Sequence, residues 1–412
     1  MDLDVNYVRS QFPVFATSRN TEAFFENAGG SYACRQTITA LTDFYINTKV
    51  QPYAQYPASA LGGQAMDHSR RRWADALGVD FSEVQFGPST SINTYVLANA
   101  VKATLKPGDE VVVTNQDHEA NTGALRRAAT EAGATIREWR IDPETGLLDP
   151  SDLADLVGDN TKVVSFPHCS NIVGQENDVK ALTAIAHAVG ARVIVDGVSY
   201  APHGFPDVAD LGPDVYLFSL YKTYSVHQGL MVVRRGLLDE LPNQGHFFNE
   251  GLLTKRLTPA GPDHAQEAAA GGVLDYVEDL AVHHGVAGAS LRDSVAAVGH
   301  LWQEAEDRLA QPLLAWLADH PEVRLIGPSR QSGPLHRAPT VAFLPLNQSA
   351  SELATKLVGL GVQISSGNFY AYRVLEGLGI DPEQGVVRAS LVHYTSADDV
   401  ALLLASLDQA LA

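Results

Sequence analysis

The stretch ARVIVDGVSYAPHGFPDVADLGPDVYLFSLYK, residues 191–222, decides the fold of this chain. It contains two short apolar runs; Asp196 closes the first, and Lys222 stands just beyond the second. Such runs are typical of strands buried in a parallel sheet between layers of helices. Polar groups at the carboxyl ends of these strands share one edge of the sheet. We therefore expect Asp196 and Lys222 to lie at that edge.

Similar apolar runs recur between residues 83 and 235, with helical stretches between most of them. They read EVQFG, EVVVTN, TIREWR, KVVSFP, ARVIVD, VYLFS and LMVVRR. This alternation predicts an α/β fold, in which a mostly parallel sheet carries helices on both faces.

The remainder of the chain predicts a second, smaller domain. After about residue 270 the sequence is rich in Ala, Leu and Val at helical spacing, and residues 294–320 predict a long connecting helix. The last part alternates strand-like and helical segments and ends in an amphipathic helix with Ser396 as its N-cap. We expect a large domain over residues 46–290, and a small α+β domain formed by residues 1–45 and 291–412.

Composition and charge exclude several classes of function. The chain has 412 residues, is 45% apolar and carries a formal charge of -19, which disfavours binding to nucleic acid or to anionic membranes. The first residues lack the apolar core of a secretory signal, and no run of 18 or more apolar residues is present to span a bilayer. With only Cys34 and Cys169, a disulfide framework is not expected. We expect a cytoplasmic protein.

The pairing of Lys222 with Asp196 indicates a cofactor. A lysine partly withdrawn from water has a nucleophilic amine, which can condense with the aldehyde of pyridoxal 5′-phosphate. A carboxylate on a neighbouring strand can keep the pyridine nitrogen of that cofactor protonated. Taken singly, each residue is an ordinary polar strand end, so the prediction of a pyridoxal phosphate site depends on the pair.

Other candidate residues follow the predicted strands in the same way. His118 comes after EVVVTNQD and can stack on a planar ring, although it also fits a solvated loop histidine. Ser89 and Thr90 precede a helix, where hydroxyls and free N–H groups bind anions, although plain N-capping explains them equally well. Asn171 follows KVVSFPHCS and can hydrogen-bond a ring oxygen or a substrate.

Eight segments, in order along the chain, together resemble a known family. They are FENAGG, the serine and threonine loop after VQFG, DHEAN, HCSNIVG, VDGVSYAPHG, SLYK, SSGNFYA and VVRASLVHYTSADDV. The chain resembles the class V aminotransferases of fold type I, and particularly their cysteine desulfurase-like members.

The resemblance implies a role for each matching residue. Lys222 would form the Schiff base, Asp196 would hold the pyridine nitrogen, and His118 would stack on the ring. The other implied contacts are Ser199 at the ring 3-oxygen, Asn171 at the cofactor or substrate, Ser89, Thr90, Ser219 and Tyr221 at the phosphate, and Arg388 with Asn27 at the substrate. Arg388 would pair with the substrate α-carboxylate, for which its planar guanidinium is suited.

The sequence departs from the family pattern at three places. Tyr370 stands where the desulfurases carry a nucleophilic cysteine. Ser199 stands where family members often carry a Gln or a His, and Tyr221 stands where they often carry a His. The hydrogen bonds around the cofactor therefore differ. Pro262 stands where many members present a Thr to the partner subunit's phosphate, which leaves a contact between subunits from this loop in doubt.

These observations predict a homodimeric enzyme that uses pyridoxal phosphate to activate the Cα of a small amino acid. Transamination is the first expectation, because it needs only Lys222 and the shared parts of the site. A C–S lyase reaction by β-elimination, or an epimerisation, without a cysteine nucleophile is the alternative. A pyridoxal phosphate-binding protein without turnover is a third. No metal site is expected, since the histidine and cysteine spacing that metals require is missing.

Overall fold

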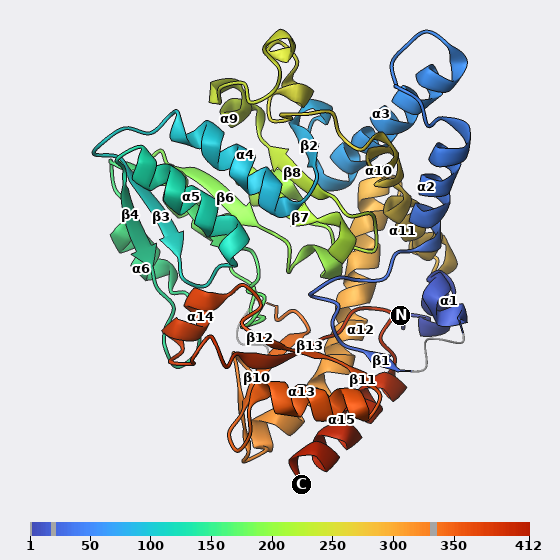
Figure 1. Cartoon of the computed structure of the whole chain (residues 1–412), viewed down its shortest axis with the longest axis vertical. Helices are drawn as coiled ribbons and strands as arrows, with labels where there is room; N and C mark the ends of the chain where they lie inside the picture. Colours follow the sequence, from blue (N-terminus) through green and yellow to red (C-terminus); the bar gives the residue numbers. More distant parts are fainter. Residues whose placement is uncertain (1, 18–21, 330–335) are drawn as a thin grey trace.

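A central sheet forms the larger lobe of the computed structural model, which describes residues 2–17, 22–329 and 336–412 (Figure 1). Its strand order is β2-β8-β7-β6-β5-β3-β4. The strands are β2 (Val84–Gly87), β3 (Glu110–Thr114), β4 (Thr135–Trp139), β5 (Thr161–Pro167), β6 (Arg192–Asp196), β7 (Val215–Ser219) and β8 (Gly229–Val233). Only β8 runs antiparallel to its neighbours β7 and β2. The predicted mostly parallel α/β sheet is confirmed.

Alternating residues of the strands pack against helices on opposite faces of the sheet. On β6, Val193 and Val195 join a cluster with α3, α7 and α11, whereas Ile194 joins a cluster with α4 and α5. This alternation follows from the two-residue repeat of a strand. The helices of this lobe are α3 (Pro57–Leu77), α4 (Thr90–Lys102), α5 (Glu119–Glu131), α6 (Pro150–Leu156), α7 (Val179–Ala188), α8 (Val208–Leu211), α9 (Arg235–Glu240), α10 (His264–Ala269) and α11 (Gly272–His283).

The smaller lobe is an antiparallel sheet covered by helices. The strand order is β12-β13-β10-β9, and a separate parallel pair is formed by β1 and β11. The strands are β1 (Ala23–Phe24), β9 (Val323–Leu325), β10 (Thr340–Pro345), β11 (Val362–Gln363), β12 (Ser365–Gly367) and β13 (Val386–Ser390), and the helices are α13 (Ala350–Gly359), α14 (Tyr372–Gly377) and α15 (Ala397–Leu411). Ser396 caps α15 as predicted, because its side chain accepts a hydrogen bond from Asp399 N.

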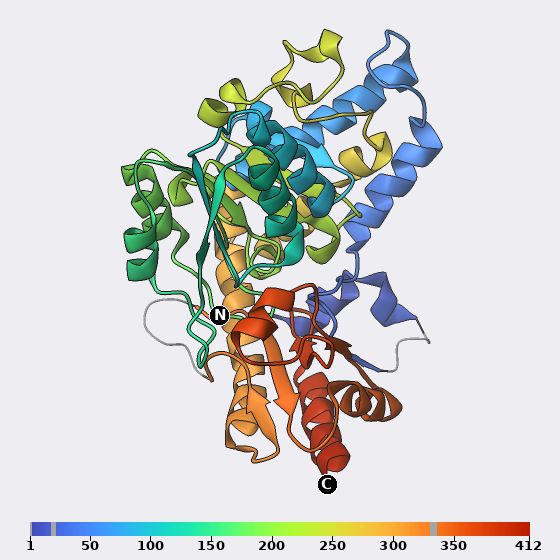
Figure 2. The ribbon, with the colours of Figure 1, turned by 60° about the vertical axis from the view of Figure 1, so that its left-hand side comes forward.

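Helix α12 (Leu291–Asp319) connects the two lobes (Figures 1 and 2). Its first half places Val298 and Trp302 in the core of the large lobe, and its second half places Leu313 and Leu317 in the core of the small one. The predicted long connecting helix is therefore confirmed. One helix shared by both cores fixes the position of the small lobe against the sheet.

The N-terminal segment contacts both lobes. Strand β1 pairs with β11 in the small lobe, whereas α1 (Val5–Ser10) contributes Val8 to the large core and α2 (Arg35–Asn47) packs against α10 and α11. The domain boundaries proposed from the sequence stay a prediction. Among the described residues, no helix combines the length and the apolar character that a membrane crossing requires.

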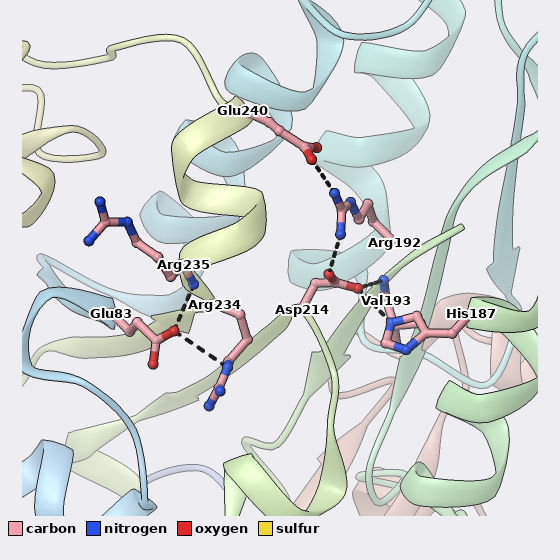
Figure 3. Close-up of polar contacts among 8 residues, drawn as sticks. All are labelled: Glu83, His187, Arg192, Val193, Asp214, Arg234, Arg235 and Glu240. Carbon is pink, nitrogen blue, oxygen red and sulfur yellow. Dashed lines mark hydrogen bonds and ion pairs between the residues drawn. The ribbon is translucent and has the colours of Figure 1, made fainter. Parts of the chain in front are cut away.

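A charged network holds the amino ends of the central strands (Figure 3). Asp214, just before β7, accepts hydrogen bonds from Val193 N at 2.8 Å, His187 Nε2 at 2.9 Å and Arg192 at 3.0 Å. Arg192 also pairs with Glu240. Because strands β6 and β7 are parallel, this network lies at the edge opposite Asp196, and it leaves the carboxyl edge free for a site.

Candidate active site

A cavity of about 1060 Å³ opens at the carboxyl edge of the central sheet. The small lobe contributes the segment from Ser365 to Tyr370 and Arg388 to its lining. Ten of the residues predicted from the sequence line it: Ser89, Thr90, His118, Asn171, Asp196, Ser199, Ser219, Tyr221, Lys222 and Arg388. The fold thus brings together side chains that lie up to 299 positions apart in the sequence, from residue 89 to residue 388.

Lys222 ends a single 3-10 turn, Leu220–Lys222, that follows β7 directly. Desolvation, and after it the positive charge of Arg388, lower the pKa of its ammonium group to about 8 against the opposing effect of Asp196. A lysine with this pKa is partly an uncharged amine near neutral pH. Its position suits both nucleophilic attack on an aldehyde and proton transfer.

Asp196 is the last residue of β6, and its Oδ1 accepts a hydrogen bond from Val198 N at 2.8 Å. Burial raises the pKa of this carboxyl group to about 6. Asp117 lies close enough that burial and the charge of Asp196 together raise the Asp117 pKa as well. Asp196 is therefore a buried acid that needs a cationic partner to stay ionised, and a protonated ring nitrogen is such a partner.

His118 is the N-cap of α5, and its Nδ1 accepts a hydrogen bond from Ala120 N at 3.0 Å. This bond assigns the ring proton to Nε2. Burial lowers the pKa of His118 to about 3, and the charges of Lys222 and Arg388 contribute to the shift. The imidazole is therefore neutral near pH 7, which suits stacking on an aromatic cofactor.

The start of α4 forms an anion cradle at one end of the cavity. Ser89 caps the helix, and the hydroxyls of Thr90 and Ser219 are hydrogen-bonded at 2.8 Å. Gly229 on β8 lies so close that a Cβ there would come within 2.5 Å of Thr90 N. Glycine therefore permits β8 to pack against the turn that presents the free helical N–H groups. A phosphate fits this end.

Arg388 on β13 is buried and already carries a partner that the sequence analysis missed. Its Nη2 lies 2.9 Å from Glu26 Oε1, its Nη1 donates to Asn171 O at 3.4 Å, and its guanidinium carbon lies 3.9 Å from the centre of the Phe369 ring. Glu26 also lines the cavity. It belongs to the segment FENAGG, in which only Asn27 was selected.

Asn27 does not line this cavity. Its amide nitrogen donates to Ser390 O at 2.7 Å, and its oxygen accepts from the Tyr394 hydroxyl. Both ends of the amide are thus engaged within the fold, and Asn27 lines a separate small cavity together with Ser199 and Lys222, so its substrate contact stays a prediction. Asn171, in contrast, lines the cavity and donates to Phe369 O at 3.0 Å.

The two cysteines are poor nucleophiles in this fold. Cys169 lines the cavity, but its thiol donates to Gly174 O at 3.2 Å, and burial raises its pKa far above the ordinary value. Cys34 is buried elsewhere, beside Thr37, and its pKa is raised to about 11. Tyr370, which the family resemblance places where the desulfurases carry their cysteine, is 72% exposed.

Comparison with known proteins identifies the family. Residues 23–253 match the model of the family described as aminotransferase class-V. The chain is 32% identical to the aminotransferase-like protein FGM3 of Gibberella zeae, over 99% of this chain and 98% of that protein. It is 27% identical to a cysteine desulfurase of Serratia proteamaculans, with the same coverage. The apo cysteine desulfurase structure from Thermococcus onnurineus superposes with a TM-score of 0.85 at 24% identity, covering 99% of this chain and 98% of that one.

Fold and family together define a pyridoxal phosphate-dependent enzyme of fold type I. The chain belongs to the class V aminotransferase family, as the motifs predicted. Its cofactor is pyridoxal 5′-phosphate, and the lining fits this group. The cavity offers an amine for the aldehyde at Lys222, a buried carboxyl group for the ring nitrogen at Asp196 and a helix N-terminus for the phosphate at Thr90.

Proposed function

We propose that this enzyme activates the Cα of a small amino acid, and that its reaction is transamination. The observation that carries the proposal is the shared cavity of Lys222, Asp196 and Arg388, in which the Lys222 pKa is lowered to about 8. This chemistry requires a base at Cα, a carboxylate that keeps the ring nitrogen protonated and a cation that binds the substrate carboxylate.

Each of these residues then has a definite task. The bound cofactor supplies a conjugated ring that accepts electrons from Cα. With the cofactor bound, Asp196 would hold the proton on the ring nitrogen, and the neutral imidazole of His118 would stack on the ring. Lys222 Nζ would take the proton from Cα. For transamination it would deliver this proton to the cofactor carbon that keeps the amino group, and not back to Cα. Arg388 binds the substrate α-carboxylate, and Asn171 contacts the cofactor or the substrate.

A lyase reaction is the second candidate, because several relatives are described as cysteine desulfurases. Elimination of a β-substituent uses the same base and the same ring, and it needs no thiol. Epimerisation differs only in the return of the proton to Cα. A protein that binds the cofactor without turnover is the alternative from another class.

A screen of amino acids against the purified holoenzyme tests the proposal. The cofactor absorbance is followed with and without a keto acid, and the products are identified by mass. Transamination predicts a keto acid product and a cofactor left in the amine form until the acceptor is added. Sulfide and pyruvate from cysteine would support the lyase, an inverted amino acid would support the epimerase, and an unchanged spectrum would support the inert protein.

We also propose that the enzyme is a cytoplasmic homodimer. In support, apolar side chains gather in two exposed places: Ile46 at the end of α2 is 72% exposed, and Phe247 and Phe248 are 85% and 70% exposed. A second copy of the chain would cover such surface. Sedimentation velocity of the variant Phe247→Ser/Phe248→Ser tests this, since a sedimentation coefficient equal to that of the wild type would contradict a role of these residues in the dimer.

The proposed location in the cytoplasm is supported by the cysteines. Cys34 and Cys169 are both free thiols, which fits a reducing compartment.

A further inference from the structure

The guanidinium that is proposed to bind the substrate carboxylate is already paired with a carboxylate of the chain itself. Glu26 Oε1 and Arg388 Nη2 are 2.9 Å apart, and their side chains are 24% and 3% exposed. Both residues line the cavity. A substrate carboxylate and Glu26 therefore compete for the same cation.

The backbone of Glu26 is fixed, whereas its side chain has little to hold it besides Arg388. The backbone forms a bridge with Ser390 and accepts a hydrogen bond from Gly29 N at 3.0 Å. Within the described residues, Oε2 of Glu26 is buried without a hydrogen-bond partner. The neighbouring Asn27, in contrast, is hydrogen-bonded at both ends of its amide. The Glu26 carboxylate is thus placed to leave Arg388 without disturbing the fold.

Arg388 also has spare binding capacity. In the described part of the chain, its Nε is buried and makes no hydrogen bond, while Nη1 makes a long contact of 3.4 Å with Asn171 O. An incoming carboxylate therefore finds unused donors on the guanidinium. Because a buried cation is costly without a counterion, either Glu26 or a substrate must neutralise Arg388.

We propose that Glu26 is a specificity switch over Arg388, which gives the cavity two substrate classes. While Glu26 pairs with Arg388, this end of the cavity has no net charge and accepts a primary amine whose amino-bearing carbon has no carboxylate. When Glu26 withdraws, Arg388 binds the α-carboxylate of an amino acid or a keto acid. The inference rests on the proposed function, because it assigns substrate classes to that same site.

A matched pair of probes tests the switch on the holoenzyme. L-alanine and ethylamine share an amino group and a methyl group, and they differ in the α-carboxylate. Their dissociation constants are measured from the cofactor absorbance for the wild type, for Glu26→Gln and for the control Glu22→Gln, which removes an exposed carboxylate from the same segment.

The two probes are expected to respond in opposite directions. In Glu26→Gln the competitor has lost its charge, so L-alanine should bind about tenfold more tightly. Ethylamine should bind about tenfold more weakly, since it then has to share the cavity with an unneutralised Arg388. Glu22→Gln should match the wild type. Unchanged affinities in Glu26→Gln, or equal shifts for both probes, would overturn the switch.

A second titration separates this inference from the proposed function. Propionate carries the carboxylate but has no amino group, so its binding, measured by calorimetry, requires no reaction with the cofactor. Glu26→Gln should bind propionate about tenfold more tightly than the wild type. If neither amine alters the absorbance of the wild type, the proposed function fails, while a propionate difference still supports the competition at Arg388. Equal propionate affinities overturn the role of Glu26.

Discussion

The hydroxyls of Thr90 and Ser219 are hydrogen-bonded at 2.8 Å, and this contact joins the first residue of α4 to the last residue of β7. It holds the positive end of a helix dipole against the strand that leads to Lys222. The anion cradle and the nucleophilic amine are therefore fixed relative to each other before any cofactor binds. Such preorganisation reduces the entropy that binding must overcome.

Replacing Thr90 by Val should weaken cofactor binding, because the variant loses a hydroxyl at the anion cradle while keeping the side-chain shape. One hydrogen bond to a charged group contributes on the order of 1.5–3 kcal/mol, so the dissociation constant for pyridoxal phosphate should rise about tenfold or more. Absorbance titration of the apo protein measures it. The control is Thr104→Val, just beyond the other end of α4, where the hydroxyl donates to Val101 O. Equal affinities of Thr90→Val and the control would remove Thr90 from the phosphate site.

The capture of the cofactor by Lys222 should depend on pH with a midpoint near 8. Only the uncharged amine attacks the aldehyde, and the Lys222 pKa is lowered from 10.5 to about 8. The rate should therefore rise with pH below 8 and level off above it, whereas a free lysine amine keeps gaining reactivity to about pH 10.4. Stopped-flow absorbance between pH 6.5 and 10 measures the profile.

Borohydride reduction followed by peptide mass spectrometry places the cofactor on a residue. Lys222 should carry the adduct, and Lys222→Ala should retain cofactor only through non-covalent contacts. An adduct on another lysine would contradict the central assignment, whatever the shape of the pH profile.

The network at the opposite edge of the sheet should govern stability rather than activity. In Asp214→Asn an amide nitrogen would replace one of the two oxygens that accept from His187, Arg192 and Val193 (Figure 3). The free energy of unfolding should fall by about 1–3 kcal/mol, as for other buried hydrogen-bonded groups that lose a partner. Urea unfolding measures it. Turnover per folded molecule should not change, because the network lies at the far ends of the strands.

The control for Asp214→Asn is Asp210→Asn. Asp210 pairs with Lys180 at 2.7 Å, but both side chains are more than 60% exposed. Exposed ion pairs contribute little to stability, so the unfolding midpoint of this control should match that of the wild type. Equal losses in both variants would contradict a special role for the Asp214 network.

The strands and ten of the residues that line the cavity could be predicted because local sequence determines them. A run such as RVIVD is buried on both faces of the sheet, and its end marks the edge where ligands bind. Asp196 ends such a run, and Lys222 and His118 stand three and four residues beyond the ends of β7 and β3, so the position of the strand places each side chain. The Ser396 cap was predicted for the same local reason.

The pair of Glu26 and Arg388 could not be predicted in this way, because its members are 362 residues apart. Neighbouring side chains in an extended segment point in opposite directions, so FENAGG alone does not say whether Glu26 or Asn27 faces the cavity. The bridge between Glu26 and Ser390 sets that direction, and it depends on tertiary packing of the two lobes. The raised pKa of Asp117 likewise arises only from burial beside Asp196.

This enzyme should not form a persulfide on a cysteine. That reaction needs a thiolate to attack the substrate sulfur, and burial raises the pKa of both Cys34 and Cys169, so that each remains a thiol near neutral pH. The phenol of Tyr370 cannot replace a thiolate, because it has no sulfur to carry. Incubation with cysteine should therefore leave the protein free of a persulfide, as measured by mass spectrometry of the intact chain.

The variants Cys34→Ser and Cys169→Ser make this experiment decisive. Cys169 is the cysteine to watch, since it lines the cavity. A stoichiometric persulfide together with alanine, abolished by either substitution, would contradict the prediction and show that a buried thiol becomes accessible in the reaction. Sulfide and pyruvate released equally by the wild type and both variants would instead favour elimination over transamination. The site supports a third outcome, in which another amino acid yields a keto acid and cysteine yields neither a persulfide nor sulfide. In that case Lys222 and Arg388 carry out the reaction without a cysteine thiol.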